Sequence, residues 1–90
     1  MNTIDGQYHT VHVTYKGVTK DVRVKAQYTV YSALARACMA FKVPDEKWVN
    51  VETYLKLERT GEILDNSLMI CETEVCEGDK LELVEKDKKA

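Results

Sequence analysis

Three cysteines and two histidines are the residues of this sequence that could bind a metal or carry out redox chemistry. Four residues separate Cys71 from Cys76, whereas zinc knuckles and redox motifs place two residues between their cysteines. His9 and His12 lie three positions apart on an alternating segment, so their side chains are expected on opposite faces of a strand. Cys38 lies in an apolar stretch of helical character and is expected in the core. We therefore expect no metal site and no cofactor.

Features of other enzyme classes are also missing from the sequence. No set of serine, histidine and aspartate indicates nucleophilic catalysis, and with four glycines in 90 residues no glycine-rich stretch could cradle a phosphate. A chain of this length forms one small domain with little room for a substrate cleft. We therefore do not expect an enzyme. The formal net charge of −2 also argues against nucleic-acid binding, which requires a concentrated basic face.

The cysteines and the hydropathy pattern indicate a cellular compartment. Three cysteines cannot all pair within one chain, and reduced thiols fit a cytoplasmic protein. No apolar run approaches the roughly 20 residues that cross a bilayer, and no basic segment followed by an apolar one resembles a secretory signal. We expect a cytoplasmic protein that does not insert into membranes.

The first third of the chain alternates between apolar and polar residues with the period of two that strands show. Valines alternate with polar residues from residue 11 to 13 and again from 22 to 24. Lys16-Gly17 lies between these segments, and glycine tolerates the positive φ of a tight hairpin turn. This pattern predicts an antiparallel hairpin. Residues 1–7 are polar and are expected to form a flexible terminus.

The period then changes to the 3.6 residues per turn of a helix. Thr29 is expected to cap the first free amides, and Pro44 is expected to stop the helix after Phe41. Met39 is expected to belong to the core and not to a ligand pocket. The apolar face of this helix is formed by Val30, Leu34, Ala37, Cys38 and Phe41.

Strand patterns recur in the second half of the chain. Residues 54–58 predict a third strand whose two leucines point inward, and Ile63-Leu64 predicts a short fourth strand. Asp65-Asn66-Ser67-Leu68 resembles a helix start and is expected to form a brief turn that buries Leu68, with Met69 or Ile70 as further candidates for burial. Residues 81–85 predict a closing strand with inward leucines and outward glutamates.

The order of elements predicts the fold class. An isolated hairpin is marginal in water, so its apolar face must be covered, and the helix is the available cover. The closing strand can lie beside the first strand. We therefore expect an α+β domain over residues 8–85, with a mixed sheet of four to five strands around one helix. Residues 86–90 are expected to form a polar C-terminal tail.

Over residues 11–84 the chain resembles ubiquitin and its relatives, the β-grasp family. The resemblance implies a ubiquitin-like β-grasp fold. It rests on the joint spacing of several features: the valines that end the hairpin, Val30 after Thr29 at the helix start, the turn Val43-Pro44-Asp45, the segment Leu57, Gly61 and Ile63-Leu64-Asp65, and the final turn and strand at residues 76–83.

Two departures from ubiquitin bear on function. Conjugated ubiquitins and sulfur carriers use a C-terminal glycine pair, whereas this sequence has no glycine after Gly78. The position matching the centre of ubiquitin's apolar receptor patch is expected to be Glu58, flanked by Lys56, and an unpaired carboxylate there would repel ubiquitin receptors. The chain therefore resembles the small non-conjugating bacterial proteins of the YukD type, which are associated with secretion systems. The alternative is a modifier or sulfur-carrier relative that has lost, or uses differently, its C-terminus.

We therefore expect a module that binds an unknown protein partner non-covalently, as a monomer or weak homodimer. Trp48 either packs over the helix end or anchors a partner. The edge of the third strand, residues 49–57, is a further candidate for strand addition. The other candidate binding residues are Lys56, Glu58, Glu82 and His12 on the outward sheet face, and the acidic stretch of Glu72, Glu74, Glu77 and Asp79, which either steers a partner or serves solubility.

Overall fold

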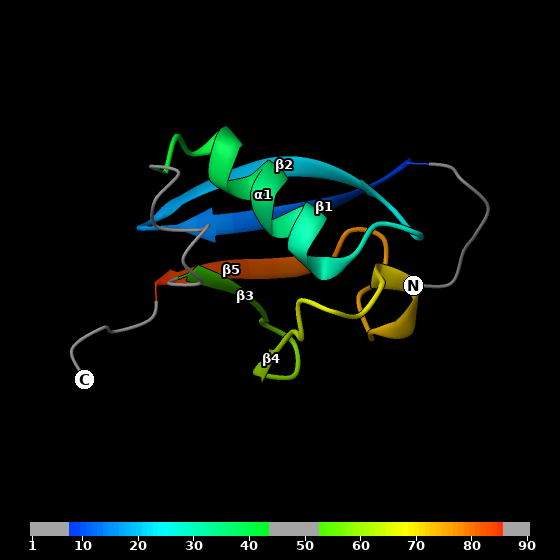
Figure 1. Cartoon of the computed structure of the whole chain (residues 1–90). Helices are drawn as coiled ribbons and strands as arrows, with labels where there is room; N and C mark the ends of the chain where they lie inside the picture. The colour runs from blue at the N-terminus through cyan, green and yellow to red at the C-terminus, as the bar shows by residue number, and fades with distance from the viewer. Residues whose placement is uncertain (1–7, 44–52, 86–90) are drawn as a thin grey trace.

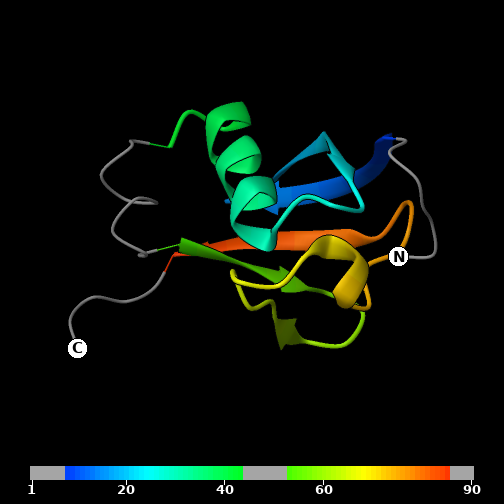
Figure 2. The same cartoon turned by 45° about the vertical axis from the view of Figure 1, so that its right-hand side comes forward.

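The computed structural model describes residues 8–43 and 53–85. Within these ranges the chain forms one α-helix, α1, and a five-stranded mixed sheet with strand order β2-β1-β5-β3-β4. Figure 1 shows α1 lying across one face of the sheet, and the turned view of Figure 2 shows the same two layers. This is the β-grasp arrangement of one helix on a mixed sheet that the order of elements predicted.

Strands β1 (Tyr8–Tyr15) and β2 (Val18–Lys25) form the expected antiparallel hairpin. Lys16 and Gly17 in the turn both have positive φ, 50° and 84°. This is the requirement of a type I′ turn, and glycine meets it without steric cost. The valines at positions 11, 13, 22 and 24 are buried, so the alternation predicted the inward side correctly.

The helix α1 (Val30–Ala40) begins as the sequence predicted, because Thr29 Oγ1 accepts a hydrogen bond from the Ser32 backbone N–H at 3.1 Å. The expectation that Met39 belongs to the core is wrong, since Met39 is 67% exposed. It lies outside the narrow stripe that faces the sheet. The buried residues of α1 are Val30, Ala33, Leu34, Ala37 and Cys38.

The helix ends through its own backbone hydrogen bonds. Lys42 adopts a left-handed φ of 58°, its N–H donates to the Met39 carbonyl at 3.2 Å, and the Val43 N–H donates to the Cys38 carbonyl at 2.9 Å. These two bonds are the Schellman arrangement that satisfies the last carbonyls of a helix. Pro44, the expected stop, lies outside the described residues.

The strand β5 (Lys80–Glu85) joins the two halves of the sheet. It runs parallel to β1 and antiparallel to β3 (Thr53–Leu57), as expected for a closing strand beside the first. The leucines of β3 and β5 are buried and face α1 together with the hairpin valines. One continuous core therefore lies between the helix and the sheet.

The segment between β3 and β5 departs from the sequence-based prediction. The short strand β4 (Glu62–Ile63) begins one residue earlier than predicted, and its isoleucine is 52% exposed while Leu64 is buried. The expected burial of Leu68 is wrong, because this side chain is 36% exposed. Ile70, one of the two further candidates for burial, is buried in the 3₁₀ helix η1 (Ile70–Glu72), where its N–H donates to the Tyr28 carbonyl at 2.7 Å.

The expected free edge of the third strand is covered by β4 at the end of the strand. β3 lies between β5 and β4, and its residues Lys56 and Leu57 pair with β4. Residues 49–52 of the proposed edge lie outside the described ranges. The strands at the two ends of the sheet are β2, with eight residues, and β4, with two.

Candidate functional site

The face of the sheet opposite α1 is the candidate functional site, and we call it the open face. Successive side chains of a strand point to opposite sides, so this face is formed by the residues that alternate with the buried ones. No helix within residues 8–43 and 53–85 covers it. Its members are Thr10, His12 and Thr14 of β1, Thr19, Asp21 and Arg23 of β2, Lys80, Glu82 and Val84 of β5, Tyr54 and Lys56 of β3, and Ile63 of β4.

A charged pair lies near the centre of the open face. The strand register places Lys56 directly opposite Glu82, and directly opposed residues of opposite charge attract each other. Ile63 lies opposite Lys56 on the other side, and Tyr54 lies opposite Val84 in a neighbouring row. Apolar groups therefore flank the Lys56–Glu82 pair on two sides.

A second row of polar residues crosses β2, β1 and β5 on the open face. His12 pairs with Asp21 on β2, and its Nδ1 lies 2.7 Å from Asp21 Oδ1. Lys80 of β5 lies opposite His12 on the other side. The open face therefore carries charges of both signs at defined register positions.

The structure brings together only some of the predicted binding residues. Lys56 and Glu82 are paired across β3 and β5, and His12 lies on the same face. Glu58, which was expected to match the centre of ubiquitin's receptor patch, lies just beyond β3, which ends at Leu57. Its N–H donates to the Lys80 carbonyl at 3.0 Å. Lys56 lies within the strand and on the open face. Trp48 lies outside the described residues.

The acidic stretch does not form a free charged patch. Glu72 Oε1 accepts a hydrogen bond from the Met69 N–H at 2.8 Å and so caps η1. Glu77 Oε1 accepts from the Thr10 N–H at 3.2 Å and lies 2.9 Å from His9 Nδ1. Both carboxylates therefore stabilise local structure. Glu74 is exposed, and its carboxylate caps no element among the described residues.

Asp79 is the most strongly engaged member of the acidic stretch. Its carboxylate accepts two hydrogen bonds from Arg59, at 2.9 and 3.3 Å, and one from the Cys76 N–H at 2.8 Å. The hydrogen bonds from the Arg59 guanidinium hold the pKa of Asp79 below its usual range, although partial burial opposes this effect. Arg59 also donates to the Glu74 carbonyl at 2.7 Å. Asp79 therefore fixes the loop that leads into β5.

We expect the substitution Asp79→Asn to lower the free energy of unfolding by about 1.5–3 kcal/mol, the net value of hydrogen bonds to a charged group. Because the folded-state pKa of Asp79 is depressed, its contribution is present above the unfolded pKa of about 4 and is lost as the pH falls through the folded value. Urea unfolding from pH 7 down to pH 2 measures both effects. The exposed Glu62→Gln serves as the control, and an Asp79→Asn curve that coincides with the control would contradict this role.

The residues that could have bound a metal are dispersed. His9 and His12 face opposite sides of β1, as predicted, and bond to Glu77 and Asp21 respectively. Cys38 is buried, which raises the pKa of its thiol, while Cys71 and Cys76 are free thiols at the surface. No metal-binding group of three or more histidine, cysteine or acidic residues occurs in the described part of the chain. No described helix is long and apolar enough to span a membrane.

Tyr54 is a member of the open face that was not among the predicted binding residues. It lies two residues before Lys56, so strand alternation places both on one side. The pairing of His12 with Asp21 was not apparent from the sequence, because the hairpin register decides which residues meet. Alternation therefore predicts the composition of this face, and the register determines its pairs.

Comparison with known proteins shows the fold. No protein-family model matches the chain, and no curated protein matches it in sequence. Among solved structures, a ubiquitin of Caldiarchaeum subterraneum is similar with a TM-score of 0.71 and 18% identity, covering 93% of this chain and all of that one. A chain from a structure on molecular mimicry of SUMO in DNA repair gives 0.74 and 20%, covering 92% and 96%.

A third similar chain belongs to a structure of toluene 4 monooxygenase HD in complex with the inhibitor 4-bromobenzoate. Its TM-score is 0.68 at 12% identity, with 89% of this chain and 100% of that chain covered. At such identities the likeness is one of fold. Together with the observed sheet order, it shows that this chain has a ubiquitin-like β-grasp fold.

Proposed function

We propose that this chain is a non-covalent protein-interaction module that binds its partner through the open face. The Lys56–Glu82 pair, aligned by the β3–β5 register and flanked by Tyr54, Val84 and Ile63, is the observation that supports this proposal. Opposed charges orient an approaching partner and speed its association. The flanking apolar groups supply area that binding removes from water.

We further propose that the module acts as one component of a larger protein complex. A chain of the same fold is found whole in the toluene 4 monooxygenase structure, which supports a role as a component of a larger assembly. The resemblance to bacterial proteins of the YukD type supports a cytoplasmic accessory of a secretion or regulatory complex. The second candidate function is that of a covalent modifier, which the likeness to a whole archaeal ubiquitin favours.

One capture experiment separates the two candidate functions. The chain is immobilised, incubated with lysate of its native source and ATP, and washed, and bound proteins are eluted in denaturant. A non-covalent module releases its partner in denaturant while its intact mass stays unchanged. A mass adduct on the chain that survives denaturation would instead establish the covalent modifier.

A further inference from the structure

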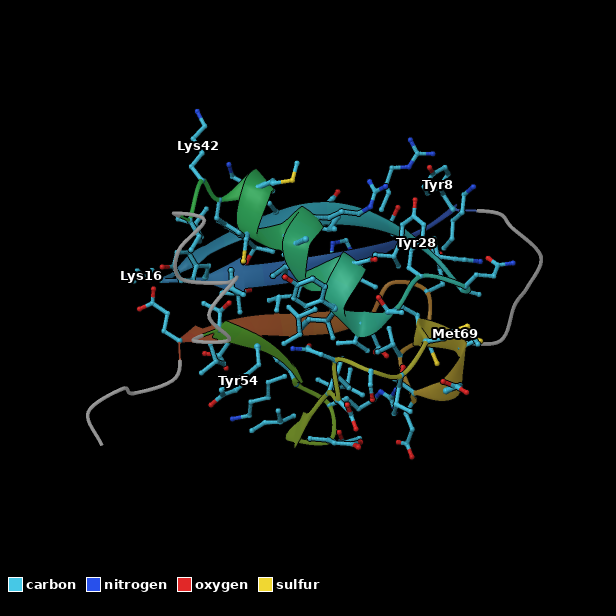
Figure 3. The ribbon with its side chains drawn as sticks, in the orientation of Figure 1. Tyr8, Lys16, Tyr28, Lys42, Tyr54 and Met69 are labelled. Atoms are coloured by element: carbon cyan, nitrogen blue, oxygen red, sulfur yellow. The ribbon has the colours of Figure 1, made fainter. Side chains whose placement is uncertain are left out.

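Two tyrosines and three cations meet where the end of the hairpin approaches the start of α1. The rings of Tyr8 and Tyr28 pack edge to face with centroids 6.3 Å apart, and Figure 3 shows both side chains together at this end of the helix. Arg23 and Lys25 of β2 lie over the Tyr8 ring at 4.9 and 4.8 Å from its centroid. Arg36 of α1 lies over the Tyr28 ring at 4.6 Å. We call these five residues the tyrosine–cation cluster.

The hydrogen bonds of the cluster run in one direction. Arg36 Nη2 donates to the Tyr28 hydroxyl at 2.8 Å, and the Tyr28 hydroxyl donates to the Tyr8 oxygen at 3.2 Å. The proton of the Tyr8 hydroxyl thus has no acceptor among the described residues and remains available to a ligand. The hydrogen bond from Tyr28 lowers the pKa of Tyr8, and the charges of Lys25, Arg36 and Arg23 lower it further. The Tyr8 oxygen therefore lies in a field that stabilises negative charge.

The three cations of the cluster have no anionic partner within residues 8–43 and 53–85. The ion pairs found between described residues join His9 to Glu77, His12 to Asp21 and Arg59 to Asp79, and none includes Arg23, Lys25 or Arg36. The Asp21 carboxylate lines a surface hollow together with Arg23 and Arg36. It is bonded to His12. Like charges gathered without a counter-ion repel each other and attract an oxyanion.

We propose that the tyrosine–cation cluster is a recognition site for a phosphoryl group carried by a protein partner. Arginine side chains offer paired N–H donors that match phosphate oxygens, and a lysine adds a point charge. The Tyr8 hydroxyl donates a further hydrogen bond. The Asp21 carboxylate repels an anion from the hollow that it lines with Arg23 and Arg36, so we expect the phosphoryl group to bind beside Tyr8.

A neighbouring hollow indicates that the phosphoryl group belongs to a peptide. Tyr28, Ser32, Ala35, Arg36 and Met39 line it along α1, and Met39 is 67% exposed there. Arg36 belongs to the cluster and also lines this hollow. A peptide can therefore place its phosphoryl group on the cluster and an apolar side chain against Met39. This inference rests on the proposed function in that both treat the chain as a protein-binding module. The cluster shares Arg23 with the open face but does not include Lys56 or Glu82.

The test is a titration of the full chain followed by ¹H–¹⁵N correlation spectra at constant ionic strength. The probes are the peptide acetyl-alanyl-phosphoseryl-leucyl-alanine amide, its unphosphorylated form, and sodium phosphate. We expect the phosphopeptide to shift the amide signals of Tyr8, Lys25 and Arg36 in a saturable way, the unphosphorylated peptide to leave them unchanged, and phosphate to bind more weakly at the same place.

Matched variants complete the test. Lys25→Gln and Arg36→Gln should each weaken phosphopeptide binding about tenfold, as expected for loss of a charge-assisted hydrogen bond, and Tyr8→Phe should weaken it without removing a charge. Lys42→Gln is the control, because Lys42 lies at the opposite end of α1 (Figure 3). Equal affinities of the Lys25→Gln variant and the unmodified chain would overturn the proposal, and so would phosphate binding as tightly as the phosphopeptide. The combined variant Lys56→Glu, Glu82→Lys should bind the phosphopeptide normally, so the two binding proposals fail independently.

Discussion

The substitution Leu34→Ala is expected to lower the free energy of unfolding by about 2–5 kcal/mol, the range for removing a fully buried leucine. Leu34 is 0% exposed and lies in the middle of α1, the one helix that covers the described sheet. Ala33 and Ala37 beside it are too small to fill the space. A domain of 90 residues has a small stability margin, so this loss is a large share of the total.

Urea unfolding monitored by circular dichroism measures this effect. Leu68→Ala is the matched control, because it removes the same atoms from a side chain that is 36% exposed, and we expect it to cost less than about 1 kcal/mol. Equal losses for the two variants would show that the helix–sheet contact is not the main source of stability. The comparison also tests the correction at Leu68, which the sequence alone placed in the core.

The parts of the fold that follow a period were predicted from the sequence. The alternating valines of the hairpin and the helical spacing of Val30, Leu34 and Cys38 each identify a buried side, because packing on one layer imposes that period. The segment from β4 to η1 has no period. Ile70 is buried and Leu68 is exposed because a backbone bond from Ile70 to Tyr28, 42 residues away in the chain, fixes this loop. Sequence spacing does not encode such a contact.

The candidate site likewise has a part that alternation predicts and a part that only the folded chain determines. Lys56 and Glu82 were predicted to point outward, because each alternates with inward leucines. Their pairing could not be predicted, since it depends on the register that sets Leu55 opposite Leu83. The engagement of Asp79 within the acidic stretch could not be predicted, because Asp79 bonds to Arg59, 20 residues earlier in the chain. Tyr8, Tyr28 and Arg36 likewise meet only in the folded chain.

The combined substitution Lys56→Glu, Glu82→Lys is expected to abolish most partner binding without unfolding the domain. It keeps the net charge and keeps opposite charges facing each other across β3 and β5, so the free energy of unfolding should change by less than about 0.5 kcal/mol. It inverts the charge pattern that a partner meets, and like charges then oppose each other across the interface. Lys56→Glu alone is less informative, since two glutamates would face each other within the sheet.

The affinity of the captured partner for the unmodified chain and for this charge-swapped variant is the most direct test of the open face as a binding surface. Titration calorimetry measures the affinity, and urea unfolding confirms that both chains are equally stable. We predict that binding weakens at least about tenfold while stability is unchanged. An unchanged affinity in a stably folded variant would show that the partner binds elsewhere and would contradict the proposed function of the open face.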